Sequence, residues 1–189
     1  MNTRALLIVL FCGAVLRPAF ARADEVPATC PLTPPSCGSQ VLQRALQNLG
    51  PFDEARASRA IGNLVAWAAR RKGLNSLEEI KRAAEQAGLR AKALQVDREA
   101  LRRLVHDAQV IANVTGNLHF CLITAVDDRG VSIYDPGLNF PTPTIPTPFF
   151  LKAWDGRVLV VSRHPLKLKP LGDHVTLLST RMLKTILGG

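Results

Sequence analysis

The sequence predicts an α+β fold, with helices in the first part of the chain and an antiparallel sheet in the rest. From Cys37 to Ala87, apolar residues recur at intervals of three and four, as on one face of a helix. From Leu89 to Ser162, they tend to alternate with polar residues, and short turns separate the runs, as in strands joined by hairpins. The 189 residues suffice for one domain with a substantial core and are few for two.

Three short helices are predicted first. The first begins at Cys37 and ends at Gly50, which precedes a proline. The second spans about 52–71, where apolar residues again follow the helical period. The third follows a capping box that starts at Ser76, and Gly88 stops it.

The sheet is predicted from period-two runs separated by turn residues. The predicted strands are 89–96, 109–114, 118–126, 131–134 and 157–162. Short helices at 97–105 and 149–154 and a Pro- and Thr-rich loop at 141–148 complete this part of the chain. The turn at 127–130 makes a hairpin of the third and fourth strands. Asp135-Pro136-Gly137 ends that ladder, because proline has no N–H to donate.

The first 23 residues are typical of a signal peptide. Arg4 supplies a positive charge, 5–16 is apolar and uncharged, and Ala21 and Ala23 are the small residues that a signal peptidase reads. We therefore expect export to the periplasm or the cell exterior, or a membrane anchor if the segment is retained. Within the mature chain we expect three parts, namely an extended Pro-rich lead-in at 24–35, a domain at 36–163 and a C-terminal tail with a short helix at 164–189.

The chain is basic, with a formal charge of +9 that falls to +6 when the three arginines of residues 1–23 are removed. Its basic clusters, Arg70-Arg71-Lys72 and Arg102-Arg103, lie in predicted helices without interleaved aromatic residues. Nucleic-acid binding by stacking needs such aromatics, so a solvated basic face is the favoured interpretation and no nucleic-acid partner is expected. Contact with a membrane is expected only through the signal peptide.

Three cysteines remain in the mature chain, Cys30, Cys37 and Cys121, which permits one disulfide and one free thiol. Cys37 stands at the start of a helix, where free N–H groups and a partial positive charge favour the thiolate, the nucleophilic form. The alternatives are a buried apolar cysteine or half of a disulfide. A metal site of Cys30, Cys37 and His119 is disfavoured, because the cysteine spacing of seven is wider than in zinc knuckles.

His119 and Asp135 are the other candidates for chemistry. The hairpin about 127–130 brings the residue after its second strand, Asp135, back beside His119 at the head of its first strand. A carboxylate that accepts the imidazole Nδ1–H would leave Nε2 to take the proton of a thiol. The alternative is a structural histidine and an ordinary Asp-Pro turn.

Several motifs resemble the bacteriocin-processing, double-glycine cysteine peptidases, a branch of the papain-like fold. The motifs are Cys37-Gly38 opening a helix, the helix-then-strand block 76–96, the run 111–114 leading to Gly116-Asn117-Leu118-His119-Phe120, and Val131-Ser132-Ile133-Tyr134-Asp135-Pro136. The resemblance spans 36–162. It implies a papain-like fold, Cys37 as nucleophile, His119 as general base and acid, Asp135 as the carboxylate that orients it, and no metal or organic cofactor.

One position departs from that family. The resemblance implies a glutamine six residues before the nucleophile, donating to the oxyanion, and Pro31 stands there. Loss of one such donor costs ~10²–10³ in rate.

The resemblance and the predicted signal peptide together give the expected function. It is hydrolysis of a peptide or leader substrate, possibly after Gly-Gly, by a free-standing exported peptidase that could work with an export system. The alternatives are a catalytically impaired peptide-binding domain and papain-like amidase or transpeptidase chemistry.

The tail ends in Gly188-Gly189. Counted back from Gly189, its apolar residues stand at the fourth, seventh, twelfth and fifteenth positions, which resembles the leaders cleaved by this family; they are Ile186, Leu183, Leu178 and Val175. One hypothesis is that the tail occupies the substrate groove, in cis or from a neighbouring molecule. The alternative is a short helix that packs on the domain.

Overall fold

The computed structural model describes residues 35–114, 119–138, 143–167 and 175–188. The predicted signal peptide, Cys30, Pro31 and the segment 116–118 lie outside these ranges. The chain divides into two units, Met1–Leu32 and Thr33–Gly189, and the second carries all the described structure. No helix in the described ranges combines the length and the apolar character needed to cross a bilayer.

The first four helices begin at, or within about two residues of, their predicted starts, and a side chain caps each of them. They are α1 Cys37–Asn48, α2 Glu54–Ala69, α3 Leu77–Gln86 and α4 Arg98–Asp107, with N-caps Ser36, Asp53, Ser76 and Asp97. Each cap accepts a backbone N–H from the first turn, which satisfies a donor without a partner inside the helix. The predicted capping box of Ser76 and Glu79 is present in full.

A seven-stranded antiparallel sheet forms the centre of the unit, in the order β6-β5-β4-β3-β7-β2-β8. Its strands are β2 Arg90–Val96, β3 Gln109–Val114, β4 His119–Val126, β5 Val131–Tyr134, β6 Thr144–Ile145, β7 Trp154–Ser162 and β8 Val175–Leu177. A separate two-stranded sheet pairs β1 Asn75–Ser76 with β9 Leu187–Gly188. The helices and the large antiparallel sheet confirm the α+β class.

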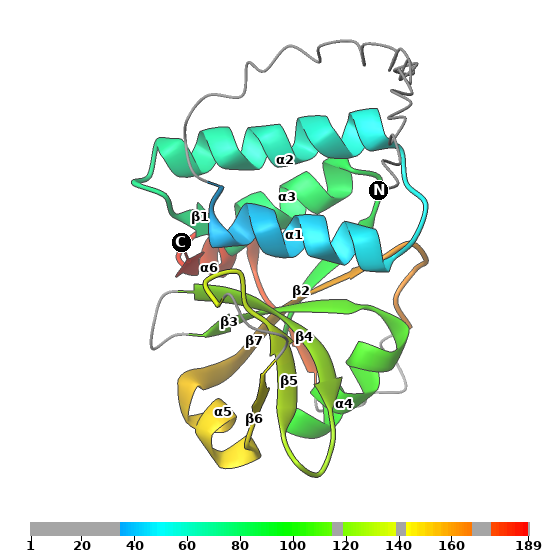
Figure 1. Cartoon of the computed structure of the whole chain (residues 1–189), viewed down its shortest axis with the longest axis vertical. Coiled ribbons are helices and arrows are strands. Elements are labelled where there is room, and N and C mark those ends of the chain that lie inside the picture. Colours follow the sequence, from blue (N-terminus) through cyan, green and yellow to red (C-terminus); the bar gives the residue numbers. More distant parts are fainter. Residues whose placement is uncertain (1–34, 115–118, 139–142, 168–174, 189) are drawn as a thin grey trace, which may run out of the picture. The chain divides into compact units, whose positions relative to one another are not determined.

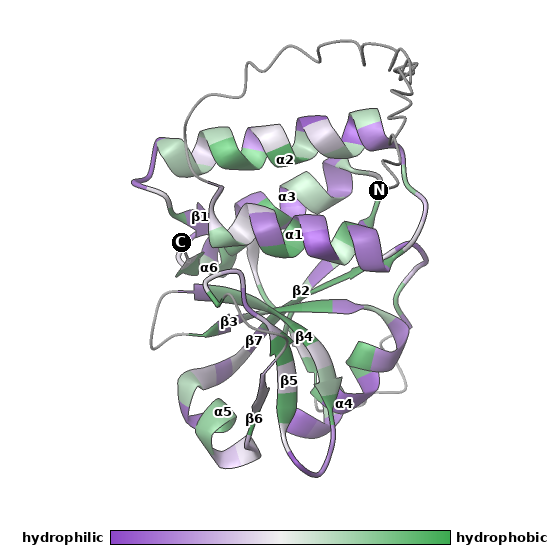
Figure 2. Cartoon of the chain, in the orientation of Figure 1, coloured by the Kyte–Doolittle hydropathy of each residue, from purple (hydrophilic) through white to green (hydrophobic). Residues whose placement is uncertain are grey.

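The sheet has a hydrophobic core on each face. One core contains Ile111, Phe120, Leu159 and residues of α1, α2 and α3, and the other contains Val110, Cys121, Val158 and residues of α4. Successive strand residues therefore enter opposite cores, as the pleat requires. Figure 2 shows the consequence, since the central strands are mainly hydrophobic while the helices carry hydrophilic residues on their outer faces.

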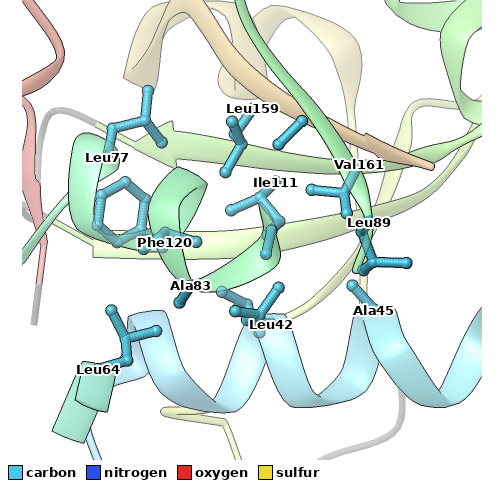
Figure 3. Packing of buried hydrophobic residues seen from close by; sticks show 14 of the residues in the cluster. Leu42, Ala45, Leu64, Leu77, Ala83, Leu89, Ile111, Phe120, Leu159 and Val161 are labelled. Atoms are coloured by element: carbon cyan, nitrogen blue, oxygen red, sulfur yellow. The ribbon is translucent and has the colours of Figure 1, made fainter. Parts of the chain in front are cut away.

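The packing of α1 on the sheet positions the Cys37 segment. Leu42 and Ala45 of α1 point towards Ile111, Leu159 and Val161 of the sheet (Figure 3), and all five side chains are fully buried. In Figure 1, α1 crosses one face of the sheet together with α2 and α3. This contact fixes the start of α1 relative to β3 and β4.

Strands occur in two places where none was predicted, the loop at 141–148 and the C-terminal tail. The Pro- and Thr-rich stretch at 141–148 includes β6, which pairs with β5, and α5 begins earlier than predicted, at Thr147–Ala153. The tail contains the predicted short helix, α6 Thr180–Leu183, but β8 also joins the main sheet beside β2 and β9 pairs with β1. Proline lacks a donor, yet Pro143 still accepts from the N–H of Ile133, which allows edge pairing.

Candidate active site

Cys37 is the first residue of α1, and Ser36 prepares its surroundings. The Ser36 Oγ accepts the N–H of Ser39 at 3.2 Å, which caps the helix. The remaining first-turn N–H groups and the helix dipole place partial positive charge beside the Cys37 sulfur. Cys37 is 5% exposed, and its Sγ accepts the N–H of Phe120 at 3.4 Å. The thiol at the start of α1 and the backbone at the start of β4 are therefore in direct contact.

A buried asparagine holds the residues on either side of Cys37. Asn75 Oδ1 accepts a hydrogen bond from the Ser36 hydroxyl, and Asn75 Nδ2 donates to the Leu64 carbonyl at 2.9 Å. A Cβ at Gly38 would lie 2.8 Å from the same Oδ1. Gly38 is therefore required for close packing here, because any side chain would displace Asn75.

The structure brings His119 and Asp135 together. The His119 Nε2 lies 2.6 Å from Asp135 Oδ1, and their side chains are 17% and 16% exposed. In the hairpin Leu122 pairs with Tyr134, so the next residue, Asp135, comes to lie diagonally across from His119. The N–H of Gly137 also donates to Asp135 Oδ1 at 2.8 Å, which fixes the carboxylate.

The predicted use of the ring nitrogens is wrong. Asp135 was expected to accept from Nδ1, whereas its carboxylate lies against Nε2. Because the carboxylate lies against Nε2, Nδ1 is the ring nitrogen left for the thiol. The two ring nitrogens exchange their expected partners, but the carboxylate can still fix the orientation of the imidazole towards the thiol.

The surroundings of His119 favour its charged form. A hydrogen bond with the Cys37 side chain is the largest influence and raises the pKa of His119, burial lowers it, and the hydrogen bond with Asp135 raises it again. The resulting pKa is about 9, compared with 6.5 for an ordinary histidine. The imidazolium therefore persists at neutral pH beside the thiol.

Cys37 and Cys121 are both free thiols, so neither forms the disulfide that the cysteine count permitted. Cys121 follows Phe120 on β4 but is fully buried in the opposite core. Burial raises the pKa of the Cys121 thiol far above its ordinary value, so this residue stays protonated and unreactive. The two cysteines thus have opposite environments, and Cys37 is the one that contacts a histidine.

Sequence reasoning missed the supporting residues Ser36, Asn75 and Asn113. Asn113 is buried on β3, and its Nδ2 donates to the backbone carbonyls of Leu187 at 3.0 Å and His119 at 3.4 Å. The N-cap position of Ser36 was readable from its place before the helix. Asn75 and Asn113 gave no local signal, because the contacts of Asn75 with Ser36 and of Asn113 with Leu187 join residues that are distant in the sequence.

A helix-terminal thiol, an imidazole and a carboxylate, held between helices and an antiparallel sheet, define the class of papain-like thiol enzymes. A sequence profile described as the Peptidase C39 family matches residues 61–165, and the chain belongs to this family. The match begins within α2, so Cys37 lies before it.

One curated relative is the probable functional amyloid protease FapD of Pseudomonas aeruginosa, 28% identical over 132 residues. The alignment covers 67% of this chain and 56% of that protein, so the chain spans little more than half the length of this relative.

Two solved structures share the fold. The first is a double glycine motif protease from an AMS/PCAT transporter in complex with the leader peptide, with a TM-score of 0.50 and 22% identity over 67% of this chain and 83% of that one. The second is the peptidase domain of Streptococcus ComA, a bifunctional ABC transporter of a quorum-sensing pathway, with a TM-score of 0.50 and 16% identity over 69% and 93%. These likenesses confirm the papain-like fold, and family membership supports a cysteine peptidase function on peptide substrates.

Proposed function

We propose that Cys37, His119 and Asp135 form a catalytic triad that hydrolyses a peptide bond. The observation that carries this proposal is the His119 ring, which contacts Asp135 at 2.6 Å and hydrogen-bonds the Cys37 side chain. In this arrangement the thiolate of Cys37 attacks the carbonyl carbon, and His119 protonates the departing amine. Water then attacks the thioester, His119 takes the proton of that water, and the acid product leaves with the thiol restored.

The oxyanion formed during attack needs donors. The backbone N–H groups at the start of α1 are one source, because a helix leaves its first donors without internal partners. Gln40 is not a ready replacement for the glutamine absent at position 31, since its Nε2 donates to the Pro35 carbonyl at 3.1 Å. We therefore expect a slow enzyme and expect Pro31→Gln to raise its turnover.

The proposed substrate is a peptide or a leader with small residues before the cleaved bond. This part of the proposal draws on the leader-bound protease that shares the fold and on the family of this chain. The predicted signal peptide leads us to propose an exported enzyme that acts on an exported polypeptide. A peptide-binding domain without turnover is the second candidate, and the proline at position 31 favours it.

Fluorogenic peptides separate these candidates. Three peptides that end in Gly-Gly, Ala-Ala or Val-Val, each closed by an aminocoumarin amide, would be mixed with the purified protein. We expect coumarin release from the Gly-Gly peptide, less from Ala-Ala and none from Val-Val. Cys37→Ala should abolish release and Asp135→Asn should weaken it, because the nucleophile is indispensable whereas orientation of the imidazole is not.

Cys121→Ala is the matched control for Cys37→Ala and should retain activity. Binding of the Gly-Gly peptide without release by any variant would support the binding domain. Equal release by Cys37→Ala and the unmodified protein would end the triad proposal.

A further inference from the structure

The C-terminal segment returns to the start of α1. After β8 the N–H of Leu178 donates to the Ala93 carbonyl at 3.0 Å, and α6 then leads to β9. β9 runs antiparallel to β1, with Gly188 opposite Asn75 and Leu187 opposite Ser76. In Figure 1 this end of the chain, in red, lies beside β1.

Hydrogen bonds place β9 beside both halves of the candidate site. On one side it pairs with Asn75, whose Oδ1 accepts from Ser36, the neighbour of Cys37. On the other side the Leu187 carbonyl accepts from the Asn113 amide, which also donates to the carbonyl of His119. One bridging residue therefore separates β9 from each of the segments that carry the thiol and the imidazole.

Two apolar side chains anchor the segment. Leu183 and Ile186 are 2% and 3% exposed and belong to the same core as Cys37 and Phe120. The residues between them, Lys184 and Thr185, are exposed. The segment thus presents one apolar face to the domain, and it ends in a buried glycine, Gly188, which pairs with Asn75.

The pairing is also short. β1 and β9 have two residues each and form a sheet separate from the main one. The further backbone bond, from Leu77 N–H to the Ile186 carbonyl at 2.9 Å, extends it by one step. So small a ladder is marginal alone, whereas β8 keeps the segment tethered at high effective concentration. A short ladder and a tether together would allow the segment to detach and rebind without leaving the domain.

We propose that the segment from Leu178 to Gly188 lies where a peptide substrate would bind beside Cys37, and that it inhibits the enzyme until it is displaced. This inference rests on the proposed function. An extended substrate would use the same backbone groups of β1 and the Asn113 amide that β9 now uses, in the manner of strand addition. The segment and a substrate would therefore exclude each other, and the buried Gly188 matches the small residues that the proposed function places before the cleaved bond.

Alkylation of Cys37 in the full-length chain tests the proposal. Ile186→Asp places a charge in the anchor and should release the segment, so iodoacetamide should label Cys37 about tenfold faster or more, since only the open fraction reacts. Thr185→Asp carries the same charge one residue earlier on the exposed side and should label at the unmodified rate. A synthetic peptide of residues 178–188 should slow labelling of Ile186→Asp again.

Cys121 reports whether the fold survives, because a fully buried thiol is labelled only on unfolding. If Ile186→Asp exposes Cys121, the milder Ile186→Ala takes its place and should still accelerate labelling of Cys37. Unchanged labelling of Cys37 with Cys121 protected would overturn the proposal. Labelling of Cys121 in both variants would also overturn it, because the segment would then be part of the core.

The coumarin peptides separate this inference from the proposed function. If Cys37 is labelled faster in Ile186→Asp but no coumarin is released, the C-terminal segment does cover Cys37 and the proposed peptidase function is wrong. If Ile186→Asp, Thr185→Asp and the unmodified chain all release coumarin at the same rate, the protein is a peptidase but the C-terminal segment does not inhibit it.

Discussion

At the scale of single residues, the histidine governs the chemistry. Its raised pKa has two sources that reinforce each other, the Cys37 side chain and the Asp135 carboxylate, and burial opposes them. In the proposed mechanism the imidazolium gives a proton to the leaving amine, so the protonated state of His119 would be the active one. The site is therefore prepared for work at neutral pH.

The pH profile of hydrolysis follows from this state. Activity should fall as the pH rises through about 9, where His119 loses its proton. Asp135→Asn removes one of the groups that raise this pKa, so the alkaline fall should move to lower pH. Coumarin release measured between pH 6 and 10 would show it. Asp128→Asn, at a side chain that is 90% exposed, is the control and should leave the profile unchanged.

At the scale of elements, the first turn of α1 is built around contacts with β1. Gly38 has no side chain because Asn75 fills that space, and Asn75 in turn joins Ser36 to α2. The helix start that carries Cys37 is thus held by a buried polar network with satisfied partners. Such networks rigidify their surroundings when they are complete.

Gly38→Ala should be destabilising by about 1–3 kcal/mol, because the new Cβ would lie 2.8 Å from Asn75 Oδ1 and force a shift. It should also lower activity by moving Cys37. Gly62→Ala in α2 is the matched control, since nothing lies within 4 Å of that Cβ. A glycine in a helix interior costs about 0.5–1 kcal/mol relative to alanine, so this control should gain stability. Urea unfolding measures the free energy of unfolding of both variants. Equal changes in the two would mean that Gly38 is not closely packed against Asn75.

At the scale of the whole unit, the sheet between two cores is what fixes α1 relative to β4. Leu42 of α1 is fully buried against the sheet, whereas Leu177 on the edge strand β8 is 64% exposed. Leu42→Ala should therefore lower the free energy of unfolding by about 2–5 kcal/mol. Leu177→Ala should change it by less than about 0.5 kcal/mol. Similar losses for the two variants in urea unfolding would mean that the α1 contact is less important than described.

Elements specified by neighbouring residues could be predicted from the sequence. The caps at Ser76 and Asp97 and the hairpin at 127–130 depend on residues within one turn of each other, and the structure has all of them. β8 and β9 could not be predicted, because their partners, β2 and β1, lie about 80 and about 110 residues away and so short a strand carries little pattern of its own.

The candidate site divides in the same way. The proximity of His119 and Asp135 followed from hairpin geometry, whereas the choice of Nε2 depends on the direction of the ring, which the sequence does not specify. Cys37 could be singled out from the sequence because it stands at the start of a predicted helix, and α1 does begin there. The supporting role of Asn75 depends on the packing of three helices, and only the fold reveals it.

The most direct test of the central claim is the location of a thiol label. Iodoacetamide would be applied to the unmodified chain, to His119→Ala and to His106→Ala, an exposed histidine of α4, and mass spectrometry would identify the labelled cysteine. At pH 6 we expect Cys37 to be labelled far faster than Cys121, and this reactivity to be lost in His119→Ala but kept in His106→Ala. A Cys37 that is inert in every protein, or equally reactive with and without His119, would contradict the assignment of Cys37 and His119 as nucleophile and base.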